Sequence, residues 1–217
     1  MIVGILALQG AVREHAAVLR LLGHNVSLVR IPADLAGVDG LVLPGGESTA
    51  IARLARPSGL LTEIRNRIDG GLPVFGTCAG LILLADDVAD PAALAGLPTI
   101  GGLNVTVRRN AFGAQLASGE ADVELTPAAA RARSSAAMGH ARPDPPSGLP
   151  ARERAPHRMR GVFIRAPRIE RVGAGVEVMA TRGDEPVAVR QGAVVACTFH
   201  PELVPDPTLH RLWLGGV

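Results

Sequence analysis

The stretch PVFGTCAGLILLA, Pro73–Ala85, places a cysteine between a short apolar run and a run rich in leucine. LPVF is typical of a buried strand and LILLA of the start of a helix, while Gly76 and Gly80 allow a sharp turn between them. The order matches the G-x-S-x-G nucleophile elbow with cysteine in place of serine. We therefore expect Cys78 at the carboxyl edge of a sheet, at a helix N-terminus that favours its thiolate. From the five residues GTCAG (76–80) alone, a small buried cysteine beside a Gly-rich turn is an equally good interpretation.

On the N-terminal side of this stretch, strand patterns alternate with helix patterns. The helix patterns are AVREHAAVLRLLG, with apolar residues at Val12, Ala16, Leu19 and Leu22, and LLTEIRNRI over residues 60–68; the strand patterns are IVGILAL (2–8), NVSLVRI (25–31) and GLVLPGG (40–46). This alternation predicts βαβ units and a parallel sheet.

On the C-terminal side, turns rather than helices separate the apolar runs. The runs are LNVTV (103–107), GVFIRA (161–166), VEVMA (176–180), PVAVR (186–190) and AVVACTF (193–199). They predict antiparallel strands that extend or cover the parallel sheet. A last helix is expected in PTLHRLWL, with Pro207 in its first turn. The fold class is therefore α/β.

The length of 217 residues and the 47% hydrophobic content indicate one globular domain over residues 1–217. Residues 127–158 differ, because they are rich in proline and arginine and lose apolar periodicity after Met138. We expect a mobile insertion there, with one short helix at 127–137. A basic arm that binds an anion is the less favoured interpretation of the segment.

Charge and cysteine usage limit the function classes. The net charge is only +2, aromatic residues make up 2% of the chain, and the basic residues are scattered, which argues against a nucleic-acid partner. Cys78 and Cys197 lie far apart in sequence and are expected as free thiols in the cytoplasm. IVGILAL is too short for a membrane span and lacks the basic region of an export signal, so no membrane association is expected.

A nucleophilic thiolate needs a base, and FHPEL (199–203) offers one at the end of the AVVACTF run. Pro201 favours an extended His200, and in an extended chain residues i and i+2 project to the same side. His200 and Glu202 would then meet, with the carboxylate orienting the imidazole of a Cys-His-acid triad.

Acyl chemistry also needs an oxyanion hole, and LPGGEST (43–49) is placed to supply one. We expect one donor from the backbone N–H of Gly46 and a second from that of Ala79, the residue after the nucleophile. A structural role is equally compatible, with Ser48 or Thr49 capping the next helix. A phosphate-binding loop is excluded because no lysine follows the glycines.

Together, GILALQGAVREH (4–15), LPGGEST, GTCAG (76–80), VRRNAFG (107–113), GVFIRAP (161–167) and FHPEL resemble the glutaminase subunits of pyridoxal 5′-phosphate synthase, a family of class I, triad-type glutamine amidotransferases. The matches span the chain except for residues 127–158. The resemblance implies a flavodoxin-like, three-layer fold in which a mostly parallel central sheet carries added antiparallel strands.

The resemblance also implies a reaction: Cys78 attacks the side-chain amide of L-glutamine, ammonia leaves, and a γ-glutamyl thioester is hydrolysed with His200 as acid and then base. No cofactor or metal is implied. The residues that would hold glutamine are Gly46, Glu47, Ser48, Arg109, Ile164 and Arg165. The α-carboxylate of glutamine favours a guanidinium and its α-ammonium a carboxylate or carbonyl. The implied partner is a (β/α)₈-barrel synthase subunit in a hetero-oligomer, which receives the ammonia.

Two other functions stay open at this point. The first is a γ-glutamyl hydrolase-like Cys hydrolase that acts without a synthase. The second is a non-enzymatic, flavodoxin-like binding domain in which Cys78 only packs or senses oxidants. A dependence of activity on the partner would distinguish the first from a synthase subunit.

Overall fold

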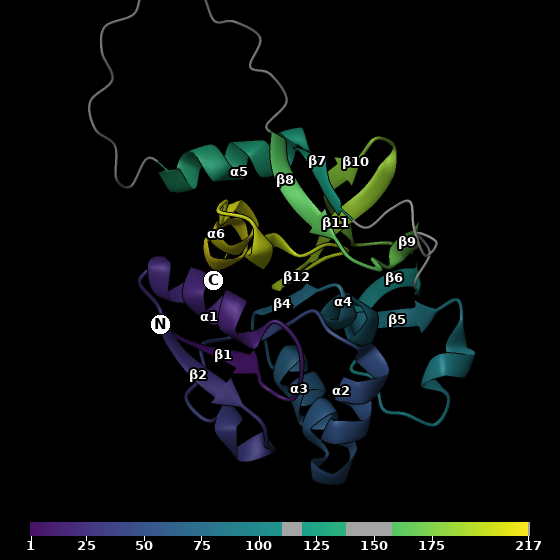
Figure 1. Ribbon diagram of the computed structural model, residues 1–217. Helices are drawn as coiled ribbons and strands as arrows, with labels where there is room; N and C mark the ends of the chain where they lie inside the picture. The colour runs from purple at the N-terminus through teal and green to yellow at the C-terminus, as the bar shows by residue number, and fades with distance from the viewer. Residues whose placement is uncertain (110–118, 138–157, 217) are drawn as a thin grey trace, which may run out of the picture.

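The largest sheet has nine strands in the order β2-β1-β3-β4-β12-β11-β10-β7-β8 (Figure 1). The structure is a computed structural model that describes residues 1–109, 119–137 and 158–216. One half of the sheet is parallel and the other half antiparallel, so the predicted α/β class with added antiparallel strands is confirmed.

The parallel half consists of β2 (Asn25–Val29), β1 (Ile2–Leu6), β3 (Gly40–Leu43), β4 (Val74–Thr77) and β12 (Val194–Cys197). The antiparallel direction predicted for AVVACTF is only half right. β12 is antiparallel to its hairpin neighbour β11 (Glu185–Gln191), but it lies parallel to β4, with Cys197 paired to Thr77. The short turn before β12 predicts that it pairs antiparallel with the preceding strand, β11. It gives no information about β4, the strand on the other side of β12. Because of this arrangement, β4 and β12 end side by side at one edge of the sheet.

The antiparallel half continues from β11 through β10 (Glu177–Arg182) and β7 (Gly119–Leu125) to β8 (Arg158–Phe163). LNVTV does not join it. This run forms β6 (Leu103–Arg108) in a separate three-stranded sheet, between β5 (Ala85–Val88) and β9 (Arg168–Val172). β5 and β6 are parallel, since a crossover that contains η3 (Pro91–Leu94) joins them.

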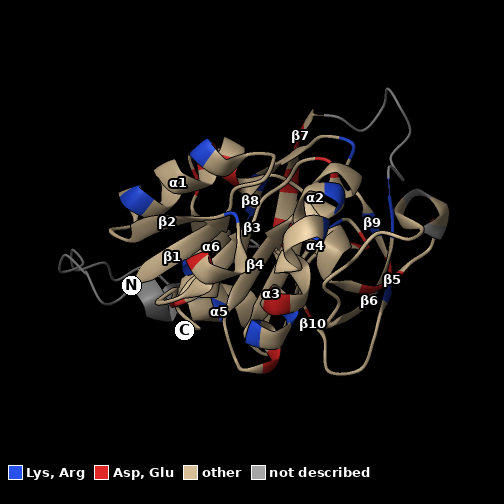
Figure 2. Ribbon diagram, turned by 90° about the horizontal axis from the view of Figure 1, so that it is seen from below, with Lys and Arg blue, Asp and Glu red and all other residues tan. Residues whose placement is uncertain are grey.

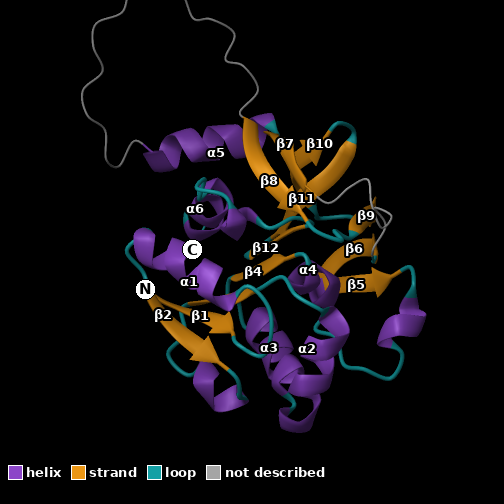
Figure 3. Ribbon diagram, in the orientation of Figure 1, coloured by secondary structure: helices purple, strands orange, loops and turns teal. Residues whose placement is uncertain are grey.

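Helices cover both faces of the large sheet, which makes three layers (Figure 3). The helices are α1 (Val12–Leu21), α2 (Ser48–Ala55), α3 (Leu60–Asp69), α4 (Ala79–Leu84), α5 (Pro127–Ala137) and α6 (Thr208–Leu214), with short 3₁₀ turns η1 (Pro32–Leu35), η2 (Arg56–Ser58) and η5 (Pro201–Leu203). The short helix expected over 127–137 is present as α5, and its Ala129 and Ala130 pack in the same core as α6. Residues 138–157 of the predicted insertion lie outside the described residues, and its last residue, Arg158, is instead the first residue of β8.

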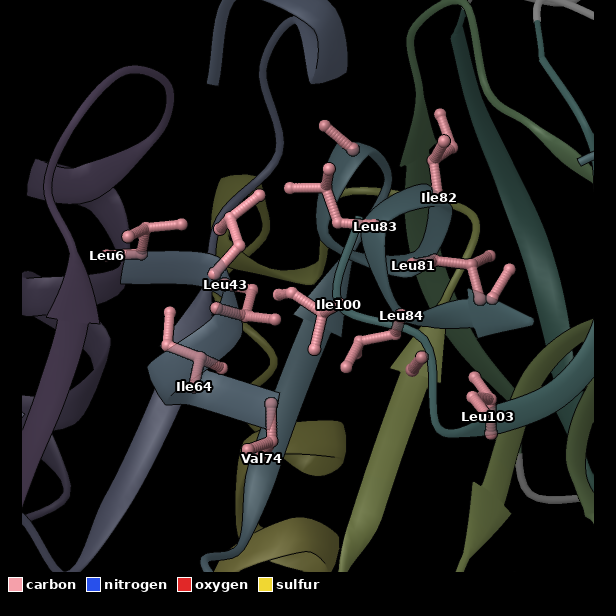
Figure 4. Packing of buried hydrophobic residues seen from close by; sticks show 14 of the residues in the cluster. Leu6, Leu43, Ile64, Val74, Leu81, Ile82, Leu83, Leu84, Ile100 and Leu103 are labelled. Atoms are coloured by element: carbon pink, nitrogen blue, oxygen red, sulfur yellow. The ribbon is translucent and has the colours of Figure 1, made fainter. Parts of the chain in front are cut away.

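Two hydrophobic cores fill the space between the layers. Side chains alternate along each strand, so Leu43 and Val74 face one core while Val42 and Phe75 face the other. Figure 4 shows the first core, in which the leucines and Ile82 of α4 lie in one cluster with Leu43 and Val74. The sheet is therefore buried on both sides where it carries the cysteine turn, which fixes the position of that turn.

Charged residues lie mainly on the outer helices and on the antiparallel strands. Figure 2 shows basic and acidic residues interspersed along these elements, whereas β1, β3 and β4 carry none. Among the described helices, none is long and apolar enough to cross a membrane.

Candidate active site

The turn between β4 and α4 has the strained backbone of a nucleophile elbow. Cys78 takes φ 47° and ψ −97°, a conformation that costs a non-glycine residue about 1–3 kcal/mol. Its backbone N–H donates to the carbonyl oxygen of Cys197 at 2.9 Å, which ties the turn to β12. A Cβ at Gly80 would lie 2.1 Å from the carbonyl oxygen of Leu43, so only glycine lets α4 pack this closely on β3. The predicted strand, sharp turn and helix are confirmed.

His200 and Glu202 stand beside this cysteine because β12 runs parallel to β4. The Nδ1–H of His200 donates to Oε1 of Glu202 at 2.8 Å, and the side chain of Cys78 is close enough to raise the pKa of the same imidazole. Cys78, His200 and Glu202 are 5%, 8% and 6% exposed. The three residues predicted as nucleophile, base and orienting carboxylate thus lie in one largely buried cluster.

The predicted local route to this pairing is wrong, although the pairing is present. Glu202 does not continue an extended chain; it lies in the 3₁₀ turn η5, with Pro201 at the first position. His200 is held by its backbone, whose N–H donates to the carbonyl oxygen of Val162 at 2.8 Å. The fixed φ of Pro201 favours the start of this turn, and the turn places the carboxylate of Glu202 next to the imidazole of His200.

Electrostatics favour a charged imidazole at this site. Burial lowers the pKa of His200, but hydrogen bonds with Cys78 and Glu202 and the charges of these two groups raise it to about 10. At neutral pH the ring therefore carries both protons, one of which faces Glu202.

The turn LPGGEST lies against the histidine and is fixed from two sides. The N–H of Gly45 donates to Oγ1 of Thr77 at 2.9 Å, and the carbonyl oxygen of Gly45 accepts from Ala11 at 3.0 Å. The N–H of Glu47 donates to Oε1 of Gln9 at 2.8 Å. The LALQG segment after β1 therefore holds the turn whose Gly46 is a predicted oxyanion donor.

Glu47, and not Ser48 or Thr49, caps α2. Its carboxylate accepts from the backbone N–H of Thr49 at 3.2 Å and of Ala50 at 2.6 Å. Burial raises the pKa of Glu47, but these hydrogen bonds and the charge of Arg109 lower it overall. The prediction that Ser48 or Thr49 caps this helix is therefore wrong. Glu47 takes the N-cap position, where its carboxylate accepts from two backbone N–H groups at once. Ser48 is buried directly behind it.

Arg109 reaches the site from the three-stranded sheet. Its Nη2 lies 3.6 Å from Oε1 of Glu47, and its backbone N–H donates to Oδ1 of Asp90 at 3.0 Å. The side chain is only 11% exposed, and its Nη1 has no hydrogen-bond partner within the described ranges 1–109, 119–137 and 158–216. A buried guanidinium with a spare donor is suited to binding a carboxylate.

Ile164 and Arg165 follow β8 and border the cysteine. The carbonyl oxygen of Ile164 lies 4.0 Å from Sγ of Cys78, and the next residue, Arg165, has a left-handed φ of 46°. Cys78 and Arg165 are both non-glycine residues with positive φ, and the contact between Ile164 and Cys78 places them near each other. Such strain collects at functional sites.

Comparisons with known proteins agree with this geometry. A model described as the SNO glutamine amidotransferase family matches residues 5–133 and 152–214.

The chain belongs to the SNO glutamine amidotransferase family.

A pyridoxal 5′-phosphate synthase subunit PdxT from Parafrankia sp. (strain EAN1pec) is 50% identical over 212 residues, which cover 98% of this chain and 91% of that protein. The PdxT subunit of Clavibacter michiganensis is 47% identical over 217 residues, covering 100% and 90%. A crystal structure of a glutamine amidotransferase superposes with a TM-score of 0.79 at 44% identity and covers 99% of both chains. A putative GMP synthase subunit from Thermoplasma acidophilum shares the fold at 18% identity, with a TM-score of 0.60 over 100% of this chain and 94% of that one.

Membership of this family does not test the role of any single residue, so the roles of the site residues stay predictions. The structure brings together Cys78, His200 and Glu202, and separately Glu47 and Arg109. In the described ranges there is no group of three or more His, Cys, Asp or Glu that could hold a metal ion.

Sequence reasoning missed two buried histidines behind the triad. His15 of α1 is 0% exposed; its Nδ1 lies 3.0 Å from Nε2 of His210 in α6, and its Nε2 lies 3.5 Å from Oε2 of Glu202. One sequence pattern could have indicated that His15 is buried, because it lies on the same apolar helical face as Val12 and Leu19. Its partner lies 195 residues away, which no local pattern reports.

Proposed function

We propose that this chain hydrolyses the side-chain amide of L-glutamine and delivers the ammonia to a synthase subunit that makes pyridoxal 5′-phosphate. The observation that carries the proposal is the contact of His200 with both Cys78 and Glu202 at the end of two parallel strands. Membership of a glutamine amidotransferase family and the names of the PdxT relatives support the choice of substrate and partner.

In the first half of the reaction, the Cys78 thiolate attacks the amide carbon of glutamine. Negative charge develops on the amide oxygen, where the N–H groups of Gly46 and Ala79 would stabilise it. The imidazolium of His200 gives its proton to the amide nitrogen, the C–N bond breaks, and ammonia leaves. A γ-glutamyl thioester and a neutral imidazole remain.

In the second half, the neutral imidazole of His200 takes a proton from water, whose oxygen attacks the thioester carbon. The C–S bond breaks, the thiolate is restored, and glutamate leaves. Glu202 stabilises the imidazolium at the start and end of the cycle through the 2.8 Å hydrogen bond to Nδ1. No group is consumed apart from glutamine and water.

The binding residues proposed for glutamine have complementary charges. Arg109, with its spare Nη1, would bind the α-carboxylate. Glu47, the Ile164 carbonyl and the backbone beside Ser48 and Arg165 would bind the α-ammonium and the chain of the substrate. Since Glu47 already caps α2 and lies 3.6 Å from Arg109, its carboxylate is held in place before the substrate arrives.

A synthase partner makes chemical sense, because free ammonia is protonated and lost in water. We place the pair in the cytoplasm as a hetero-oligomer in which the partner is a (β/α)₈ barrel. Ammonia release from glutamine, measured with and without the synthase subunit, tests the proposal. Release that rises strongly on adding the synthase supports it. Equal release without the synthase would favour a γ-glutamyl hydrolase-like enzyme, and no release under either condition would reject glutaminase activity.

A further inference from the structure

The second oxygen of Glu202 needs its own explanation. Oε1 accepts from His200, but Oε2 is buried, and within the described part of the chain no group meets hydrogen-bond criteria with it. An unpaired buried carboxylate oxygen is costly. Nε2 of His15 lies 3.5 Å from this oxygen.

His15 and His210 are both neutral at this position. Burial, followed by the nearby charges of His210 and His200, lowers the pKa of His15 well below its usual value, and burial lowers the pKa of His210 to about 4. Each ring therefore carries one N–H, and the question is which nitrogen holds it.

The contacts favour one assignment of these protons. Nδ1 of His15 faces Nε2 of His210 at 3.0 Å, whereas Nε2 of His15 faces two oxygens, Oγ1 of Thr77 at 3.2 Å and Oε2 of Glu202 at 3.5 Å. With the proton on Nε2, His15 donates toward the oxygens and accepts from His210. With the proton on Nδ1, a nitrogen lone pair would face the carboxylate, and His210 would bury an unsatisfied N–H at its Nδ1, which has no partner among the described residues. Orphaned donors are rarer than orphaned acceptors.

Aromatic packing keeps both rings in this orientation. Phe75 of β4 meets His15 edge-on at 6.2 Å and His210 edge-on at 5.1 Å between ring centroids, and it stacks on Trp213 at 5.8 Å. In Figure 1, α1 and α6 lie next to each other above β1 and β4. His15 of the first helix thus contacts both His210 of the last helix and Glu202.

We propose that His15 is a positioning residue for the reaction: its Nε2–H, fixed by the N–H of His210, holds the second oxygen of Glu202 so that the first faces His200. The inference rests on the proposed function, in which Glu202 orients the base. It assigns no contact with substrate to either histidine.

The test compares kcat and KM for glutamine in the complex with the synthase subunit. His15→Leu removes the N–H at similar volume and should lower kcat about tenfold or more with KM within about twofold, the size typical of lost supporting hydrogen bonds. His15→Gln places an amide donor near the position of Nε2 and should recover most of kcat. The matched control is His24→Leu, beyond the end of the same helix, which should leave both constants unchanged.

A double-mutant cycle separates positioning from general damage. If His15 acts through Glu202, adding His15→Leu to Glu202→Gln should lower kcat by less than about twofold further. An equal loss in both backgrounds, or no loss in the single variant, overturns the inference. If Glu202→Gln alone leaves kcat unchanged, Glu202 does not orient the base and the inference is overturned with it. If the parent complex releases no ammonia from glutamine, the proposed function itself fails, which is a distinguishable result.

A measurement on the unmodified protein covers the case in which His15→Leu does not fold. Nitrogen chemical shifts of ¹⁵N-histidine-labelled protein report which ring nitrogen is protonated. We expect His15 to be neutral with its proton on Nε2 at pH 6 to 8, conditions in which an exposed histidine gains or loses its charge. A proton on Nδ1, or a charged His15, contradicts the inference.

Discussion

His200 packs directly against the backbone of Gly45: a Cβ at this glycine would lie 2.2 Å from Cε1 of the imidazole. The proposed oxyanion turn and the proposed catalytic base can therefore approach each other this closely only because residue 45 has no side chain. This contact links the loop after β3 to the end of β12.

Gly45→Ala should push the imidazole away from Cys78. We expect kcat for ammonia release to fall by about a hundredfold, since displacing a catalytic group by about an ångström has effects of this order. The control is Gly70→Ala, where the added Cβ would meet only carbonyl oxygens at 3.4 Å and 3.5 Å and φ is −78°. A Gly45→Ala enzyme with normal kcat would mean that the ring does not act from its position in the structure.

His200 and Glu202 should differ in their importance. His200→Asn removes the proton carrier and should lower kcat by roughly a thousandfold or more, whereas Glu202→Gln removes only the orienting charge and should cost less. Steady-state ammonia release measures both. Equal losses, or a larger loss at Glu202, would show that the assigned roles are wrong.

Arg109 should affect substrate binding more than chemistry. Arg109→Ala should raise KM for glutamine about tenfold or more, the value of one charge-assisted hydrogen bond, with a smaller change in kcat. Arg108→Ala is a matched control, because Arg108 is the neighbouring residue at the end of β6 and its exposed side chain pairs with Glu170 of β9. Unchanged KM in Arg109→Ala would remove this residue from the glutamine site.

His15 and His210, the buried histidines with lowered pKa values, should make the fold sensitive to acid. The pKa of His210 is about 4 in the folded protein and about 6.5 when unfolded, so the unfolded chain binds the proton first. The free energy of unfolding should therefore fall as pH drops from about 6.5 to 4, by about 3 kcal/mol from this group alone. His15 acts in the same direction.

Urea unfolding at pH 4.5 and pH 7 measures this loss, and His210→Gln should reduce it. The comparison uses the difference between the two pH values, so a general loss of stability in the variant cancels. An identical difference in the variant and the parent would show that His210 is not buried as a neutral ring.

Local patterns predicted the parts of the site that are close in sequence. The strand, turn and helix around Cys78 follow from the small residues Gly76 and Gly80. The pairing of His200 with Glu202 was predicted from their spacing, although a 3₁₀ turn and not an extended chain produces it. β7 and β9 were not predicted: GEADVEL and RIERV carry charged residues on their solvent-facing sides, which weakens a strand signal.

The rest depends on contacts between distant segments. The parallel pairing of β12 with β4 joins residues about 120 positions apart, and turn spacing does not encode it. The contacts of His15 with Glu202 and with His210 likewise form only when the first helix, α1, packs next to the last helix, α6. Glu47 as the cap of α2 was missed because Ser48 and Thr49 are stronger capping residues by type.

The central claim is that Cys78, in its strained turn, is the nucleophile that releases ammonia from glutamine. The most direct measurement is ammonia release by the synthase complex that contains Cys78→Ala, beside the same substitution at the buried Cys197. We predict that Cys78→Ala keeps its fold and loses about a thousandfold or more of the rate, whereas Cys197→Ala loses about 1 kcal/mol of stability and keeps the rate. Near-normal ammonia release by a folded Cys78→Ala complex would contradict the account.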